Sequence, residues 1–403
     1  PLPKEAEKKP VLNDKYSLKE MLADPAVTPL WTMLNARGHR MGMIGVPTTT
    51  PAPQIDGFTV SGGGGGVNKI DGIPDGFCHP KEIASILEET RYEFDVRLST
   101  MPEKTFPEFI RRVEEVVSSN TRAAIALDAE YRPEVLFLCL RPTTGLQYLA
   151  RYDIHEAAKA GKTGPAPSEN VAMLRRHYAF LDDQIRQIFE AVAPDRFILT
   201  ADHGTAPYRK RVNVNAALLE LGFQSPRAKA ASGLKSTLRR VKKMLPRSFV
   251  SRYGKTVRKS LGGMELNFDP QKTQAFGNHH IRGVYCNDEE RFGGPVKADE
   301  VEALTDRICE ALNADPRLMA EGISARPFRR LFEGASQTWQ LPDIELDAPD
   351  TAFFLGVGPL IEDNPNWVET PRDLSFAHNP FSGTKGATPL MCVDSETAAL
   401  VSK

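Results

Sequence analysis

Cysteine is scarce in this sequence, and no cysteine stands in a motif. The five are odd in number, widely spaced and form no CxxC pair: Cys78, Cys139, Cys286, Cys309 and Cys392. This pattern argues against a disulfide framework and against a zinc–thiolate cluster. We therefore expect a reducing compartment. Cys139 and Cys392 stand in apolar runs, so we interpret both as small buried hydrophobic residues.

Long apolar runs and an excess of one charge are also missing. No run approaches the ~20 residues of a membrane-spanning helix, and the chain opens with a polar, Lys/Pro-rich segment instead of a signal peptide. The formal net charge of -1 provides no general attraction to nucleic acid or anionic membranes. We expect a cytoplasmic protein. Export is left open, because the sequence does not begin with Met.

Helix-like and strand-like segments alternate along the chain. Residues 1–29 have the composition of a linker, and we expect one large domain over 30–403. Apolar residues at helical spacing precede the apolar runs 41–46, 135–140 and 195–202. This alternation predicts an α/β fold with a mainly parallel central sheet sandwiched between helices. Ligands of such sheets bind at the carboxyl ends of the strands.

Two segments interrupt this pattern. The glycine run 62–66 resembles no phosphate-binding motif and is interpreted as a flexible loop. The segment 225–264 contains twelve Lys and Arg residues and no acidic residue, with a leucine and valine stripe at helical spacing. It predicts a basic helical insertion. Residues 227–259 either pack on the domain as a solvated insertion or bind an anionic membrane surface. Aromatic residues hardly interleave it, so no specific nucleic-acid binding is expected.

The sharpest chemical signal is Thr200-Ala-Asp-His-Gly204, at the end of the apolar run 195–202. A carboxylate and an imidazole side by side at a strand end can bind one divalent metal, and Gly204 lets the chain turn away. The donor set suits Zn, Mn or Fe better than Ca or Mg. Two alternatives stay open: Asp202 caps the next turn, and His203 bonds to the backbone.

Several segments resemble one enzyme family. Residues 200–204 and the following segment 212–223 are similar to the "[ST]-D-H-G" strand end of the alkaline phosphatase superfamily and its continuation. Residues 42–51 and 55–62, with 269–276 and 283–287 downstream, resemble its type I phosphodiesterase branch. The resemblance runs from about Leu30 to the end of the chain and implies an alkaline phosphatase-like fold.

The resemblance implies a site with two metals and a Ser or Thr nucleophile. It implies that Asp202 and His203 bind the metal facing the nucleophile and that His378 is a further ligand. It also places Thr144 and Tyr148 where the family has an Asp and a His, so these two positions are degenerate, and one or two ions are expected. Asp153 and His155 either substitute for them or are polar residues opening an exposed loop. His279 and His280 either contact substrate phosphate or belong to a solvated loop.

We expect a metal-dependent hydrolase of phosphoesters or phosphodiesters, acting on phosphorylated small molecules, lipids or nucleotides. Nothing before Leu30 matches the family's first strand or its nucleophile, so we also expect an incomplete site and exposed apolar sheet edges. Two other functions remain open. One is a binding protein that has lost part of its metal site, and the other is a phosphomutase or phosphoryl transferase on the same fold.

Overall fold

The computed structural model describes residues 28–63, 72–96, 98, 101–140, 143–161, 168–226, 268–278, 282–332, 341–349, 352–354, 358–375 and 381–401. The chain divides into two compact units. The α/β unit is formed by Asp14–Arg209 and Asn364–Lys403, and the inserted unit by Lys210–Asp363. A single domain over 30–403 stays a prediction, because a compact insertion can belong to the domain that contains it.

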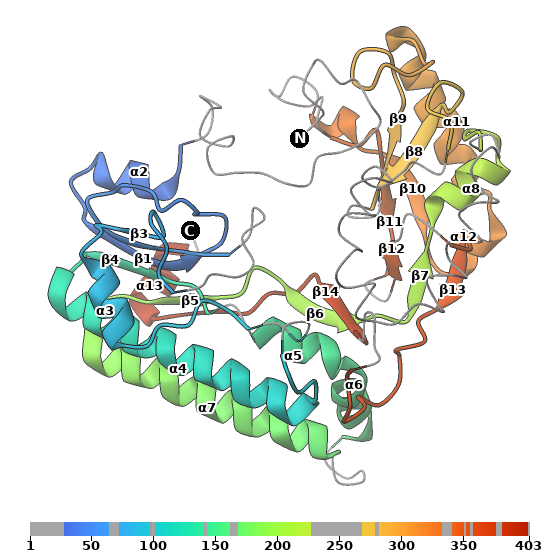
Figure 1. The fold of residues 1–403 in the computed structure, drawn as a ribbon. Helices are drawn as coiled ribbons and strands as arrows, with labels where there is room; N and C mark the ends of the chain where they lie inside the picture. The colour runs from blue at the N-terminus through green and yellow to red at the C-terminus, as the bar shows by residue number, and fades with distance from the viewer. Residues whose placement is uncertain are drawn as a thin grey trace. The chain divides into compact units, whose positions relative to one another are not determined.

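A four-stranded mixed sheet lies in the α/β unit, in the order β3-β2-β1-β4 (Figure 1). Strands β1, β2 and β4 are parallel and β3 is antiparallel to β2. Met43 and Ile44 of β1 point to opposite faces of the sheet and are both fully buried, so β1 is covered on both sides. The strands are β1 (Met41–Val46), β2 (Gly57–Ser61), β3 (Cys78–His79) and β4 (Val135–Leu138).

Two long helices, α4 (Phe106–Tyr131) and α7 (Glu169–Val192), pack side by side in this unit (Figure 1). Each begins at a hydroxyl cap. The Thr105 side chain accepts a hydrogen bond from the Glu108 amide, and Ser168 accepts one from Val171; such caps contribute about 1 kcal/mol each. The shorter helices are α2 (Leu30–Asn35), α3 (Ile83–Glu89), α5 (Thr143–Leu149), α6 (Arg151–Ala160) and α13 (Ser395–Val401).

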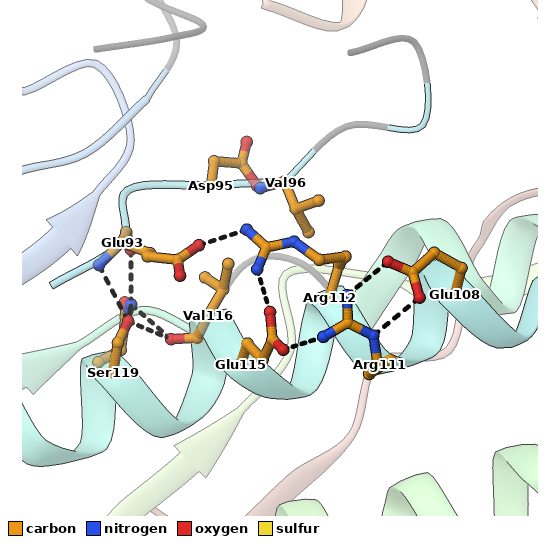
Figure 2. Close-up of polar contacts among 10 residues, drawn as sticks. Glu93, Asp95, Val96, Glu108, Arg111, Arg112, Glu115, Val116 and Ser119 are labelled. Atoms are coloured by element: carbon orange, nitrogen blue, oxygen red, sulfur yellow. Dashed lines mark hydrogen bonds and ion pairs between the residues drawn. The ribbon is translucent and has the colours of Figure 1, made fainter. Parts of the chain in front are cut away.

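The outer surface of α4 carries a chain of ion pairs, which Figure 2 shows. Arg112 pairs with Glu93 at 2.7 Å and with Glu115, and Arg111 pairs with Glu115 and with Glu108. The Glu93 amide also donates to Ser119 Oγ at 3.0 Å. Every one of these charges has a partner, so the network holds the segment before α4 on the helix. It leaves no charge free for a ligand.

The strand ending at the Asp-His pair departs from the sequence-based prediction. β5 (Ile198–Thr200) has only three residues, and its pairing within the described chain is antiparallel, to β15 (Met391–Val393). Ile198 is 60% exposed. The prediction of a buried strand over 195–202 is therefore wrong, because no element of the described chain covers Ile198 and Leu199. Cys392 of β15 is exposed for the same reason, which corrects its interpretation as a buried residue.

The next strand, β6 (Gly204–Pro207), pairs antiparallel with β14 (Gly383–Gly386). The α/β class is confirmed, and the sheet that contains β1 is mixed. Strand β1 is covered on both faces. That the whole central sheet is mainly parallel and lies between helices stays a prediction. In the described part of the chain, no helix combines the length and apolar character needed to cross a membrane.

The inserted unit contains a four-stranded antiparallel sheet, β10-β11-β9-β8, and a three-stranded sheet, β12-β7-β13. Its apolar core includes buried residues of α8 and α11. Its elements are β7 (Lys210–Val212), α8 (Val214–Glu220), β8 (Ala275–Asn278), β9 (Gly283–Cys286), η3 (Ala298–Glu300), α11 (Val301–Asn313), α12 (Pro316–Ala320), β10 (Ser324–Pro327), η4 (Arg329–Phe332), β11 (Ile344–Asp347), β12 (Ala352–Phe354) and β13 (Ile361–Asp363). The basic segment 227–259 lies outside the described residues.

Candidate functional site

Asp202 and His203 lie in the short connection between β5 and β6, where the chain bends at Asp202. Gly204, directly after them, begins the pairing with β14. A Cβ atom at position 204 would lie 2.2 Å from the carbonyl oxygen of Thr388, so only glycine fits there. Gly204 therefore allows the close approach of the chain at Thr388 directly after the Asp-His pair, and the predicted turn of the chain at Gly204 stays a prediction.

The His203 ring is oriented by its own backbone. Its Nδ1 lies 2.8 Å from the Gly204 carbonyl oxygen, and a carbonyl can only accept, so Nδ1 carries the hydrogen. This leaves Nε2 with a free lone pair, 3.5 Å from Asp202 Oδ2. The carboxylate is largely exposed and the imidazole largely buried. Two electron-pair donors thus face each other, an arrangement that a proton or a divalent cation between them stabilises.

Tyr148 forms one wall of this pair. It lies near the end of α5, and its ring stacks on that of His203 with centroids 6.3 Å apart and planes 8° apart. Burial first, and then the Asp202 carboxylate, raise the pKa of Tyr148 to about 12. The phenol is therefore neutral at physiological pH, a form that can donate a hydrogen bond and is a poor metal ligand. Its buried hydroxyl has no hydrogen-bond partner among the described residues.

Thr144 lies one helical turn before Tyr148, on the same side of α5. Helix α5 follows β4 in the chain and therefore begins near the carboxyl end of that parallel strand. Its residue Tyr148 contacts His203. The structure thus brings one of the two degenerate positions, Tyr148, into contact with the Asp-His pair.

Asp153 and His155 do not open an exposed loop, because both lie in α6. Asp153 is buried, and its carboxylate accepts hydrogen bonds from Ser168, Asn170 and Thr370, including one of 2.7 Å from the Thr370 hydroxyl. His155 Nε2 lies 2.7 Å from a guanidinium nitrogen of Arg209. Both side chains have partners, so neither replaces the missing ligands in this arrangement.

His279, His280 and His378 lie outside the described residues, so their proposed roles stay predictions. Among the residues that are described, no three His, Cys, Asp or Glu side chains gather closely enough to hold a metal ion. Arg151, Arg209 and Trp367, in contrast, lie in the α/β unit beside these residues and were not singled out by any motif. Their spacing in the sequence contains no signal that would have identified them.

A family model described as "Type I phosphodiesterase / nucleotide pyrophosphatase" matches residues 4–289. The match includes more than half of the chain, together with α5 and the Asp202-His203 turn. The chain belongs to the type I phosphodiesterase/nucleotide pyrophosphatase family. This confirms the resemblance found in the sequence motifs. A comparison with curated proteins finds no match.

Membership of the type I phosphodiesterase/nucleotide pyrophosphatase family indicates a hydrolase of phosphodiester or pyrophosphate bonds, with phosphorylated or nucleotide substrates. The local geometry is compatible with this chemistry. It contains an oriented imidazole, a carboxylate and a neutral phenol at one turn.

Proposed function

We propose that the chain cleaves phosphodiester or pyrophosphate bonds at the turn containing Asp202 and His203, with the help of a divalent metal. The observation that carries the proposal is the separation of 3.5 Å between His203 Nε2 and Asp202 Oδ2, with Nδ1 tied to the Gly204 carbonyl. A carboxylate and a neutral imidazole form a donor set that fits Zn, Mn or Fe. Such an ion supplies Lewis acidity toward a phosphoryl oxygen.

The roles of the chain's own residues follow from their contacts. Asp202 and His203 would hold the ion, and the Gly204 carbonyl selects the His203 tautomer that presents Nε2. Tyr148, neutral and stacked on His203, is placed to donate a hydrogen bond to a phosphoryl oxygen. The nucleophile that the resemblance implies is not assigned to any described residue.

We expect at most one firmly bound metal per chain. Thr144 and Tyr148 stand where the resemblance implies an Asp and a His, and a tyrosine with a pKa of about 12 does not ionise to bind a second ion. Metal analysis of a protein that includes any preceding segment provides the measurement. Two tight equivalents would contradict the alignment of Thr144 and Tyr148 with ligand positions.

Hydrolysis of an aryl phosphodiester tests the site itself. After dialysis against a chelator and addition of Zn, Mn or Fe, His203→Ala and Asp202→Asn should each lower kcat/KM by about 100-fold or more. The matched control is Asp183→Asn, which removes an exposed carboxylate of α7 that pairs with Arg186, and it should leave kcat/KM unchanged. Equal activity of wild type and His203→Ala would refute the proposal.

Tyr148 supports a second possible function, that of a binding protein. A phenol at a ligand position favours a binding protein that retains the fold and has lost part of its metal site. No metal uptake together with no hydrolysis would identify that function. Transfer of the phosphoryl group to an added alcohol, in place of water, would identify a phosphomutase or phosphoryl transferase.

A further inference from the structure

Two arginines of the α/β unit, Arg151 and Arg209, form no ion pair with any residue that the structure describes. Arg151 begins α6, and Arg209 follows β6, which contacts α6. Arg111 and Arg112 on the surface of α4, in contrast, are paired with glutamates. The Nε atoms of Arg151 and Arg209 are buried without a hydrogen-bond acceptor among the described residues. A buried donor without a partner costs about 1–3 kcal/mol, so this arrangement lowers stability unless a ligand supplies the acceptor.

The Arg209 guanidinium is held in one orientation by aromatic neighbours. Its Nη2 donates to His155 Nε2 at 2.7 Å, because a guanidinium cannot accept. Its Cζ lies 5.0 Å from the centroid of the Trp367 ring, within the range of a cation–π contact. The His155 and Tyr152 rings contact the same indole, with centroids at 5.4 Å and 5.3 Å. This packing fixes the fork of N–H donors before a ligand arrives.

The surroundings of these side chains are positive. The pKa of His155 is lowered, first by burial and then by the charge of Arg209, with smaller contributions from Arg151 and Lys159. Glu156 alone acts in the opposite direction. Burial also lowers the pKa of Arg151. These groups favour an anion over a cation or a neutral ligand.

The cluster adjoins the candidate active site. Arg151 follows Tyr148 by three residues, and both pack on Gly383 of β14. A Cβ at Gly383 would lie 2.8 Å from Arg151 Cβ and 3.0 Å from Tyr148 Cα. Tyr148 in turn stacks on His203. A ligand that reaches from the Asp-His turn past Tyr148 therefore meets Arg151.

We propose that Arg151 and Arg209, with His155 and Trp367 orienting Arg209, form a phosphate-binding subsite beside the Asp202-His203 turn. Guanidinium forks bind the oxygens of phosphate in a bidentate manner, and the Nε of each arginine has no acceptor among the described residues. The phosphate is either a second phosphate group of the substrate, a role that rests on the proposed function, or free inorganic phosphate. Binding itself does not depend on catalysis.

Equilibrium binding to the chelator-treated protein tests the subsite without any chemistry. Calorimetric titration with inorganic phosphate and pyrophosphate, at low ionic strength, should show saturable binding. Arg151→Met and Arg209→Met should each raise the dissociation constant about tenfold or more, because each removes charge-assisted hydrogen bonds. The matched control is Arg186→Met on α7, whose guanidinium pairs with Asp183 and Glu190, and it should bind like wild type. His203→Ala should also bind like wild type.

Thermal melting separates a ligand site from a structural role. Since Arg151 has no ion-pair partner among the described residues, Arg151→Met should melt at the same temperature as wild type or higher while binding phosphate more weakly. Arg209→Lys keeps the charge without the fork and should bind with intermediate affinity. Equal affinity of wild type and both Met variants would overturn the proposal. A lowered melting temperature of Arg151→Met without loss of binding would overturn it as well.

A kinetic comparison identifies the source of the phosphate. If the substrate carries it, Arg151→Met should raise KM for a pyrophosphate diester and leave an aryl phosphodiester with a single phosphate unaffected. If free phosphate occupies the subsite, Arg151→Met should weaken inhibition by inorganic phosphate and leave both KM values unchanged. Loss of all hydrolysis in wild type would refute the proposed function but not the subsite, which the binding data decide.

Discussion

At the scale of single residues, Tyr148 is the position where an experiment can separate a structural role from a chemical one. Because its hydroxyl has no partner among the described residues, Tyr148→Phe should not lower the melting temperature. It should lower kcat by about tenfold if the phenol donates to a phosphoryl oxygen during the reaction. Both quantities are measured on the same preparation, by thermal melting and by hydrolysis of an aryl phosphodiester.

The control is Tyr178→Phe on α7. The Tyr178 hydroxyl accepts a hydrogen bond from the Gln147 side chain, so its removal should destabilise the protein without a comparable loss of kcat. The opposite pattern, with Tyr148→Phe unstable and fully active, would show that Tyr148 only packs against His203.

At the scale of elements, the contact between α4 and α7 contains a buried histidine. His177 of α7 is fully buried, and its Nδ1 lies 3.2 Å from Glu114 Oε1 of α4. Burial lowers the pKa of His177, and the hydrogen bond and charge of Glu114 oppose this shift only in part. The folded protein therefore keeps His177 neutral at pH values where the unfolded chain protonates it.

Stability should consequently fall as the pH decreases from about 6.5, the ordinary pKa of histidine, toward the lower pKa in the folded state. Urea unfolding at pH 7 and pH 5 measures this difference, which should be smaller in His177→Gln. Glu114→Gln removes the group that raises the pKa of His177, so the loss of stability should extend to lower pH. An unchanged pH dependence in both variants would be inconsistent with this assignment.

The strands at the Asp-His turn behave differently from β1. Ile198, Leu199, Leu390 and Met391 are all at least 37% exposed, and Phe137 of β4 is 42% exposed. These side chains are exposed apolar surface, while the expectation of unpaired apolar sheet edges stays a prediction. The first strand that the resemblance implies, and the incompleteness of the site, stay predictions.

At the scale of the whole molecule, the basic segment 227–259 is the part of the sequence in which positive charge is concentrated. It carries many positive charges in a chain of net charge -1, so it is the strongest local attraction for an anionic surface. Deletion of 227–259 should reduce retention on liposomes that contain anionic lipids and leave retention on neutral liposomes unchanged. The melting temperature should also stay unchanged if the segment is an insertion. Equal retention with and without the segment would show that residues 227–259 do not bind anionic membranes.

The sequence by itself determined the elements that carry a continuous apolar run or an apolar stripe. Met41–Val46 was predicted with its observed bounds, and the apolar stripes over 106–127 and 171–191 lie in α4 and α7. These predictions succeeded because a continuous apolar run or a stripe at helical spacing leaves few ways to remove side chains from water. The family was equally accessible, since several motifs stand in the same order along the chain.

Only the tertiary structure decided what those elements contact. The apolar run 195–202 resembles a central strand, yet β5 is short and exposed, because burial depends on neighbours that the run does not encode. The sequence allows Asp153 and His155 as alternative metal ligands, but in the structure Asp153 is hydrogen-bonded to Thr370 and His155 to Arg209. Arg151, Arg209 and Trp367 come from distant positions in the chain. No local pattern reports that Arg151 and Arg209 both lie near His155, because that depends on which segments fold side by side.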